Sequence, residues 1–169
     1  MKSNLISKSE TASIMKQISE EWKIELPKTK NLRLHHISDN EIIITGDGIP
    51  AIKIDDKILP HLSEIELLKK FPYITVDMGA IKFVCKGANI MRPGITKLTN
   101  FNDGEIICVV EESNNKFLSV GIAKMSSDKA NSTKTGIVVE NLHYISDKFW
   151  ETKKAVSYTH LTLPTNREV

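Results

Sequence analysis

Near the start of the chain, hydrophobic residues recur at helical spacing. Ile14, Ile18 and Trp22 are each four residues apart, so their side chains would form one apolar stripe facing a core. Upstream, Ser7 and Glu10 have the spacing of a capping box, in which the serine caps the first turn and the glutamate reaches back. The pattern predicts an amphipathic helix from about Glu10 to Trp22, with the tryptophan in the core.

Short runs rich in β-branched residues follow, separated by turn residues. The predicted strands are Leu32 to Ile37, Glu41 to Thr45 and Ala51 to Ile54. Pro60 suits the first position of a helix, and we expect that helix to end at Phe71, because a residue before proline resists the α region. The pattern over residues 1–71 therefore predicts a small α+β unit.

A compact motif between Tyr73 and Leu98 organises the second half of the chain. A β-type run, Tyr73 to Val76, leads to Asp77, whose carboxylate is expected to cap a helix beginning near Gly79. The run that follows is too short for its period to separate helix from strand. Gly87 stands where a helix C-cap glycine would lie, and Ile95 to Leu98 resumes a strand.

Three longer apolar segments complete the second half. They are Glu105 to Glu111, Phe117 to Met125 and Gly136 to Ile145. Gly121, inside the second segment, suggests a bulge or a barrel corner. Several short strands with one short helix favour a closed barrel over a sandwich, and the whole chain is expected to be of the α+β class.

The motif resembles the PUA domain, a small RNA-binding barrel. The match is carried by Val76-Asp77-Met78-Gly79-Ala80, by Lys86-Gly87-Ala88-Asn89 and by Met91-Arg92-Pro93-Gly94-Ile95. The chain looks most similar to the malignant-T-cell-amplified-sequence translation factors and their stand-alone archaeal relatives. The resemblance implies a pre-PUA α+β domain at residues 1–71 and a PUA pseudo-barrel of mixed strands, with one or two short helices, at residues 72–154.

The last fifteen residues differ in composition from the rest. Ala155 to Val169 is threonine-rich and contains few charges, whereas the family-like part stops just before it. The segment is typical of a non-native or disordered tail. We expect it to carry no function.

Charge and cysteine content restrict the location and the kind of site. The formal net charge of the 169 residues is +2, so any RNA contact must be a local patch and not a field over the whole surface. Cys85 and Cys108 lie in apolar runs and are expected to be buried thiols. Without a signal peptide or a run of about 20 apolar residues, the chain is expected to be cytoplasmic and independent of membranes.

Signals of catalysis are missing from the sequence. It contains no nucleophile elbow, phosphate-binding loop or dinucleotide fingerprint. His35 and His36 are neighbours on a predicted strand and would point to opposite faces, while His61 and His143 have no serine or cysteine at motif spacing. We therefore expect no enzyme activity, no metal and no cofactor.

The candidate RNA-binding residues combine small residues, which allow RNA to approach closely, with cations that can contact phosphates. The backbone N–H groups at the start of the Ala80 helix are expected to add phosphate donors. Phe83, Tyr144 and Trp150 are interpreted as core or barrel-closing residues. Family resemblance and charge together give the set Asp77, Gly79, Ala80, Lys82, Lys86, Gly87, Ala88, Arg92, Pro93, Gly94 and Lys97.

The functional hypothesis follows from the resemblance. It implies a non-catalytic RNA-binding protein of translation, acting with the acceptor end of tRNA or with ribosomal RNA on the small ribosomal subunit, in initiation or recycling. A translation-factor partner could dock on the N-terminal domain. The alternative is an accessory subunit that guides an RNA-modifying enzyme to tRNA or ribosomal RNA.

Overall fold

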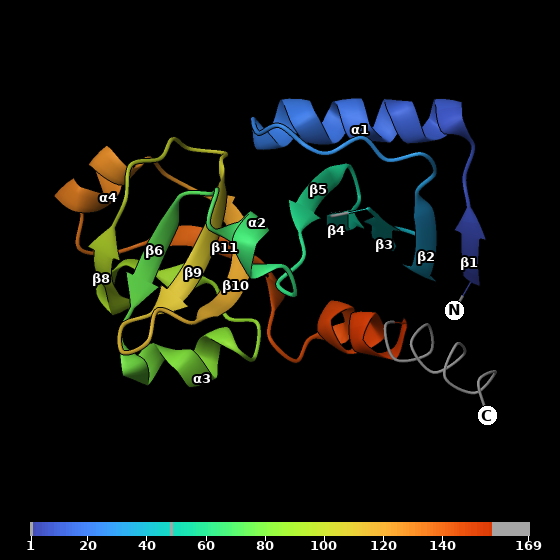
Figure 1. The fold of residues 1–169 in the computed structure, drawn as a ribbon. Coiled ribbons are helices and arrows are strands. Elements are labelled where there is room, and N and C mark those ends of the chain that lie inside the picture. Colours follow the sequence, from blue (N-terminus) through green and yellow to red (C-terminus); the bar gives the residue numbers. More distant parts are fainter. Residues whose placement is uncertain (1, 48, 157–169) are drawn as a thin grey trace.

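Two sheets form the frame of the protein. The computed structural model describes residues 2–47 and 49–156. The first sheet is antiparallel, in the order β1-β2-β3-β4-β5, and the second has the order β7-β11-β10-β9-β6-β8. The second sheet curves into a nearly closed barrel (Figure 1). The predicted α+β class, with a small N-terminal unit before a pseudo-barrel, is confirmed.

The N-terminal unit is larger than its sequence pattern indicated. Its elements are β1 (Lys2–Leu5), α1 (Lys8–Trp22), β2 (Arg33–Ser38), β3 (Glu41–Gly46), β4 (Ile49–Ile54), β5 (Lys57–Pro60) and α2 (Ile65–Leu68). Strands β1 and β5 were not predicted. Both are four-residue edge strands, too short to show alternation.

Helix α1 forms as predicted, two residues earlier than expected. The Ser7 hydroxyl accepts the Glu10 backbone N–H at 3.1 Å and thereby caps the first turn. At the other end, the Trp22 indole donates to the Ile58 carbonyl at 2.9 Å and packs edge-on against Phe71. The core role of Trp22 is confirmed.

The helix predicted from Pro60 is wrong in its start. Pro60 ends β5, opposite Ala51, and α2 begins only at Ile65. Proline is tolerated there because β5 is an edge strand of the sheet. The short helix that remains holds a Lys69–Glu66 ion pair.

The second unit contains the barrel and its short helices. They are β6 (Tyr73–Val76), η1 (Met78–Ala80), α3 (Ile81–Val84), β7 (Ile90–Met91), η2 (Arg92–Gly94), β8 (Ile95–Leu98), β9 (Ile106–Glu111), β10 (Phe117–Ala123), α4 (Ser127–Ser132) and β11 (Ile137–Tyr144). The bulge expected at Gly121 is confirmed by a register shift between β10 and β11 at Val120 and Gly121.

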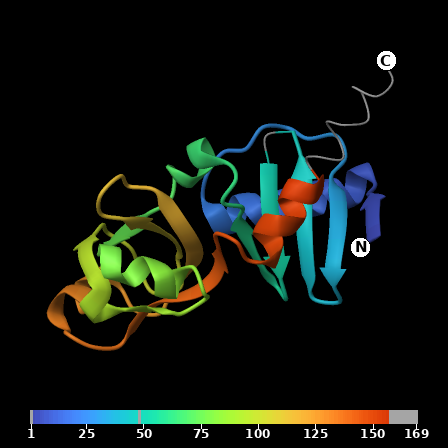
Figure 2. The same cartoon turned by 90° about the horizontal axis from the view of Figure 1, so that it is seen from below.

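A final helix returns from the barrel to the first unit. Residues 148–156 are helical, and Figures 1 and 2 show this helix on one face of the first sheet, with α1 on the opposite face. Trp150 lies in this helix and stacks on His61, with ring centroids 6.2 Å apart. The interpretation of Trp150 as a barrel-closing residue is therefore wrong. Of the expected tail, 155 and 156 extend the helix, and 157–169 lie outside the described residues.

The hydrophobic core does not divide where the chain passes between units. One cluster contains the core of the first sheet together with four residues of the second unit, namely Ile106, Cys108, Val120 and Phe149. A second cluster fills the barrel. The domain boundary between Phe71 and Pro72 stays a prediction about the course of the chain.

Two buried histidines join the units. The Leu62 N–H donates to Nε2 of His143 at 3.1 Å, so Nδ1 of that ring carries the proton and donates to Asp147 at 2.8 Å. In the same way, His61 accepts the Ser63 N–H at Nδ1 and donates from Nε2 to the Phe149 carbonyl at 3.0 Å. We call these three residues, His61, His143 and Asp147, the interdomain clasp.

Burial and the neighbouring His143 lower the pKa of His61 to about 4. An unfolded chain protonates His61 near pH 6.5, so folding stability is unaffected by this group above that pH and falls as the pH decreases toward 4. For Asp147, burial raises the pKa, but hydrogen bonds from His143, Trp150 and Tyr144 outweigh it, and the net shift is downward. Both groups make the folded state acid-sensitive.

We expect the free energy of unfolding to fall by about 2 kcal/mol between pH 7.5 and pH 5 through His61 alone. His61→Gln removes this titration, so its urea midpoint should change less over the same range. The matched substitution His36→Gln, on the partly exposed face of β2, should keep the full dependence. An equal pH dependence of the urea midpoint in the parent and in His61→Gln would contradict the assignment of His61 to the clasp as a buried, neutral imidazole.

Candidate nucleic-acid interface

Some of the candidate residues lie together around α3, and Ala80, Ala88 and Gly94 line one cavity there. The Asp77 N–H donates to the Gly94 carbonyl at 3.0 Å, which brings η1 and η2 together. Between α3 and β7 lies a cavity of about 320 Å³. Its lining residues are Val76, Ala80, Phe83, Val84, Ala88, Asn89, Ile90, Met91 and Gly94.

Exposed apolar side chains rim this cavity. Phe83 is 56% exposed and Met91 46% exposed, and both line the cavity. The prediction that Phe83 belongs to the core is wrong, because α3 is a single turn in which Val84 is the buried side chain. Exposed aromatic and methionine side chains beside a cavity are typical of a binding surface. We call this cavity and its rim the α3 face.

The helical turn before α3 is capped as predicted. The Asp77 carboxylate accepts the Ala80 N–H at 2.9 Å, and Glu112 accepts the Met78 N–H at 2.9 Å. The expectation that these N–H groups bind phosphate is wrong, because two carboxylates already accept them and would repel an anion. Any phosphate contact must come from side chains elsewhere on the face.

Gly87 ends α3 in the way its position predicted. Its φ is +97°, and the N–H groups of Gly87 and Ala88 donate to the carbonyls of Val84 and Phe83, which is the Schellman arrangement. A Cβ at Gly87 would lie 3.1 Å from the Tyr144 ring. Glycine is therefore required both by backbone conformation and by the close approach of Tyr144.

Asn141 of β11 stabilises the same turn by hydrogen bonds. Its side-chain amide donates to the carbonyls of Val84 and Ala88, each at 3.0 Å, and its backbone N–H donates to the Asn89 side chain. The turn that carries Lys86 and Gly87 is thus fixed to the barrel wall. No spacing in the sequence could have identified Asn141, since it lies more than fifty residues away.

The four candidate cations are not equivalent. Lys82, Lys86 and Lys97 are exposed, and the Lys82 ammonium lies 5.2 Å from the centre of the Phe83 ring. Arg92 instead donates from Nε to the Ala130 carbonyl at 2.5 Å and from Nη1 to the Ile95 carbonyl at 3.3 Å. Its guanidinium fixes η2 to α4, so charge reversal there would disturb the fold.

Other candidate residues differ in exposure. Gly79, Ala88 and Pro93 are exposed, while Asp77, Ala80, Gly87 and Gly94 are partly buried. Lys97 lies on β8 opposite Thr75 and does not line the cavity. Lys116, which sequence analysis did not select, is exposed in the β9–β10 hairpin, where its charge acts on the Cys85 thiol of the α3 turn.

Among the described residues, the histidines and Cys108 lie away from the α3 face, whereas Cys85 ends α3. Within residues 2–47 and 49–156, no group of three or more His, Cys, Asp or Glu side chains is placed to hold a metal ion. Cys108 is buried, and burial raises its pKa above the usual thiol range. Cys85 is partly buried and also free. His61 and His143 belong to the clasp.

Comparison with known proteins agrees with this geometry. Residues 72–145 match the PUA domain family. An uncharacterised protein of Methanocaldococcus jannaschii is 38% identical over 132 residues, which is 76% of this chain and 80% of that protein. Malignant T-cell-amplified sequence 1 of Danio rerio is 40% identical over 136 residues, covering 76% of this chain and 75% of the relative. The chain belongs to the family of PUA-domain proteins that includes malignant T-cell-amplified sequence 1.

Solved structures extend the family likeness to both units. A hypothetical protein from Pyrococcus horikoshii OT3 superposes with a TM-score of 0.74 at 26% identity, over 89% of this chain and 99% of that one. A PUA domain from Aeropyrum pernix K1, crystallised with tartrate, gives 0.75 at 25% identity, over 90% and 91%. PUA membership supports an RNA-binding role for the chain. Among the described residues, no helix is long and apolar enough to cross a membrane.

We expect Gly87→Ala to destabilise the protein by about 1–2 kcal/mol, because alanine resists a positive φ and its Cβ would press on Tyr144. Thermal melting measures the effect. Gly79→Ala is the matched control: its φ is not positive and its nearest contact would be Asp77 at 3.5 Å. A Gly87→Ala variant as stable as Gly79→Ala would show that the turn tolerates a side chain.

Proposed function

We propose that the chain is a non-catalytic, cytoplasmic RNA-binding protein of translation, which binds tRNA, the small ribosomal subunit or both during initiation or recycling. The α3 face is the observation that carries the proposal. It places an apolar cavity and an exposed aromatic ring beside exposed lysines, within a PUA domain.

The cavity suits an unpaired nucleotide better than a duplex. Its volume of about 320 Å³ lies at the lower end of the range for small-molecule pockets. Phe83 and Met91 offer apolar surface to a base, and proteins read single-stranded RNA by stacking splayed bases on aromatic rings such as that of Phe83. The A-form helix itself presents no unstacked base to this cavity.

Lysines around Phe83 supply the phosphate contacts in this proposal. Lys82 and Lys86 are exposed on α3 and the turn that follows it, and a flexible ammonium can follow the backbone on either side of a stacked base. The carboxylates of Asp77 and Glu112 lie at the N-terminal end of η1, before the helix that carries Lys82. The RNA backbone should therefore run along the Lys82 and Lys86 side of the cavity.

A free single-stranded end fits these requirements, and the acceptor end of tRNA is such an end. This supports the tRNA acceptor end over internal duplex RNA as the ligand. The resemblance to the malignant-T-cell-amplified-sequence translation factors supports the setting on the small ribosomal subunit. No observation on the α3 face favours the alternative role as a guide subunit for an RNA-modifying enzyme.

A binding role without catalysis is consistent with the placement of the titratable residues. Both ring nitrogens of the buried His61 and of the buried His143 are engaged in hydrogen bonds, one of each pair joining the two units. On the α3 face, Asp77 accepts a backbone N–H as a cap. We therefore assign the face to recognition alone.

We expect the double variant Lys82→Glu/Lys86→Glu to bind tRNA at least tenfold more weakly than the parent, as measured by fluorescence anisotropy. Each lost phosphate contact should also reduce the slope of log K against log salt by roughly 0.7–0.9. Both side chains are exposed, so thermal stability should be unchanged.

Lys134→Glu serves as the matched control. Lys134 is exposed and follows α4, which Figure 1 shows at the other end of the barrel from α3. Each substitution carries the same charge change, so a general loss of electrostatic attraction would weaken binding equally per substituted lysine. The proposal fails if Lys134→Glu and the double variant lose comparable affinity per charge. Co-sedimentation with small ribosomal subunits then tests the setting.

A further inference from the structure

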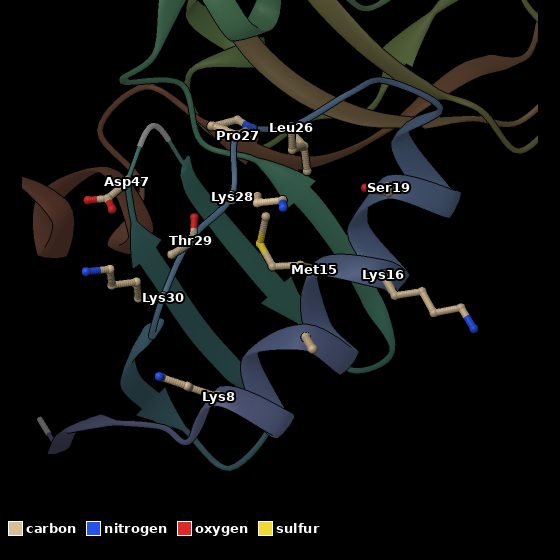
Figure 3. A pocket seen from close by; sticks show the side chains of 11 residues that line it. Lys8, Met15, Lys16, Ser19, Leu26, Pro27, Lys28, Thr29, Lys30 and Asp47 are labelled. Atoms are coloured by element: carbon tan, nitrogen blue, oxygen red, sulfur yellow. The ribbon is translucent and has the colours of Figure 1, made fainter.

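The N-terminal unit carries a second concave surface, far from the α3 face in sequence. It lies between α1 and the connector that leads to β2, and its volume is about 700 Å³. Figure 3 shows the connector running alongside α1, with the groove between them. The lining residues are Lys8, Ala12, Met15, Lys16, Ser19, Leu26, Pro27, Lys28, Thr29, Lys30 and Asp47. We call this surface the α1 groove.

Its charge is strongly one-sided. Four lysines line it, Lys8 and Lys16 from α1 and Lys28 and Lys30 from the connector, against the single carboxylate of Asp47. In the described part of the chain, none of the four ammonium groups has a carboxylate within 4.0 Å. An anionic ligand would meet uncompensated positive charge from both walls.

A buried hydroxyl adds an unused hydrogen-bonding group. Thr29 Oγ1 is buried and has no hydrogen-bond partner among the described residues, whereas buried polar atoms are almost always paired. A Cβ added at Gly46 would lie only 2.8 Å from the Thr29 methyl carbon, so the Thr29 side chain packs closely against Gly46. Because this oxygen is buried, a ligand would reach it only after the connector shifts.

The apolar part of the groove is aliphatic. Met15 reaches from α1 toward Leu26 and Lys28 in Figure 3, beside Pro27. Bases of single-stranded RNA stack on aromatic rings, and the groove has none among its lining residues. Aliphatic side chains set among lysines are instead complementary to a protein segment in which carboxylate and aliphatic side chains alternate.

The length of the groove sets the size of that segment. Lys8 to Ser19 spans about 16 Å along the helix axis, at 1.5 Å per residue. An extended chain rises about 3.3 Å per residue, so roughly five residues would fill the groove.

We propose that the α1 groove binds a short, acidic, amphipathic segment of a protein partner. Its carboxylates lie beside the lysines that line the groove, of which Lys8 and Lys28 turn toward the gap between helix and connector in Figure 3, and its aliphatic side chains contact Met15 and Leu26. The groove belongs to the first unit and does not use the α3 face, so the proposal stands apart from the proposed RNA function.

The test uses the full chain and a defined probe, a peptide of alternating glutamate and leucine, seven residues long. In a titration followed by ¹H–¹⁵N NMR at low salt, the parent should show shift changes in residues 8–19 and 26–30 and not around α3. Lys16→Glu/Lys28→Glu should weaken binding roughly tenfold, because two attractive contacts become repulsive.

Two further variants separate charge from shape. Ala12→Tyr leaves the charge unchanged and fills the groove from an exposed helical position, so it should also weaken binding at least fivefold. Lys70→Glu, exposed and outside the groove, should bind like the parent. Thermal melting checks that each variant is folded.

The same titration with oligouridylate RNA decides between occupants. The expected result is shift changes around α3 only. RNA shifts in residues 8–19 and 26–30, abolished by Lys16→Glu/Lys28→Glu, would overturn the proposal in favour of a nucleic-acid groove. Peptide binding that is unaffected by both the charge variant and Ala12→Tyr would also overturn it.

Discussion

Strands β10 and β11 approach so closely at Gly121 that a Cβ there would lie 2.0 Å from the Glu140 carbonyl oxygen. Only glycine permits this contact, and the pairing shifts beside it, because Leu142 is an extra residue on β11 between the partners of Val120 and Gly121. The irregularity changes which way the following side chains point. Asn141 and Tyr144 contact the α3 turn, whereas His143 between them turns to the first unit. One bulge thus positions both the candidate RNA surface and the clasp.

The bulge explains how a small barrel supports two surfaces. Strand β11 fixes the turn that carries Lys86 and Gly87 on one side. On the other side its His143 accepts the N–H of Leu62 from the first unit and donates to Asp147, which accepts the Trp150 N–H of the helix 148–156. The first unit is therefore held firmly against the barrel, with its own α1 groove on the far side of the sheet from the helix 148–156 (Figures 1 and 2). This geometry would allow one molecule to hold an RNA end and a protein segment at the same time.

Local signals were sufficient where a residue acts on its own neighbours. The cap by Asp77, the positive φ of Gly87 and the bulge at Gly121 all follow from short-range backbone chemistry, and each was predicted. Signals failed where tertiary contacts decide. Pro60 suits a helix start but ends an edge strand that only the sheet order reveals, and the outward direction of Phe83 depends on which side of a single turn meets the barrel. Arg92 looked like a free cation because its carbonyl partners, Ala130 and Ile95, come from the folded chain. Asn141 bonds to the α3 turn, and Lys116 acts on Cys85 of that turn, only because the folded chain brings distant strands together.

The central claim is that the α3 face holds the unpaired end of an RNA by stacking on Phe83. It is tested most directly by combining Phe83→Ala with removal of the single-stranded 3′ nucleotides of tRNA, and measuring all four affinities by fluorescence anisotropy. Phe83 is mostly exposed, so the variant should remain folded. We expect Phe83→Ala to weaken binding of intact tRNA by about 1–3 kcal/mol and to leave binding of trimmed tRNA unchanged. Equal losses for intact and trimmed tRNA would contradict the claim, because they would show that Phe83 does not contact the unpaired end.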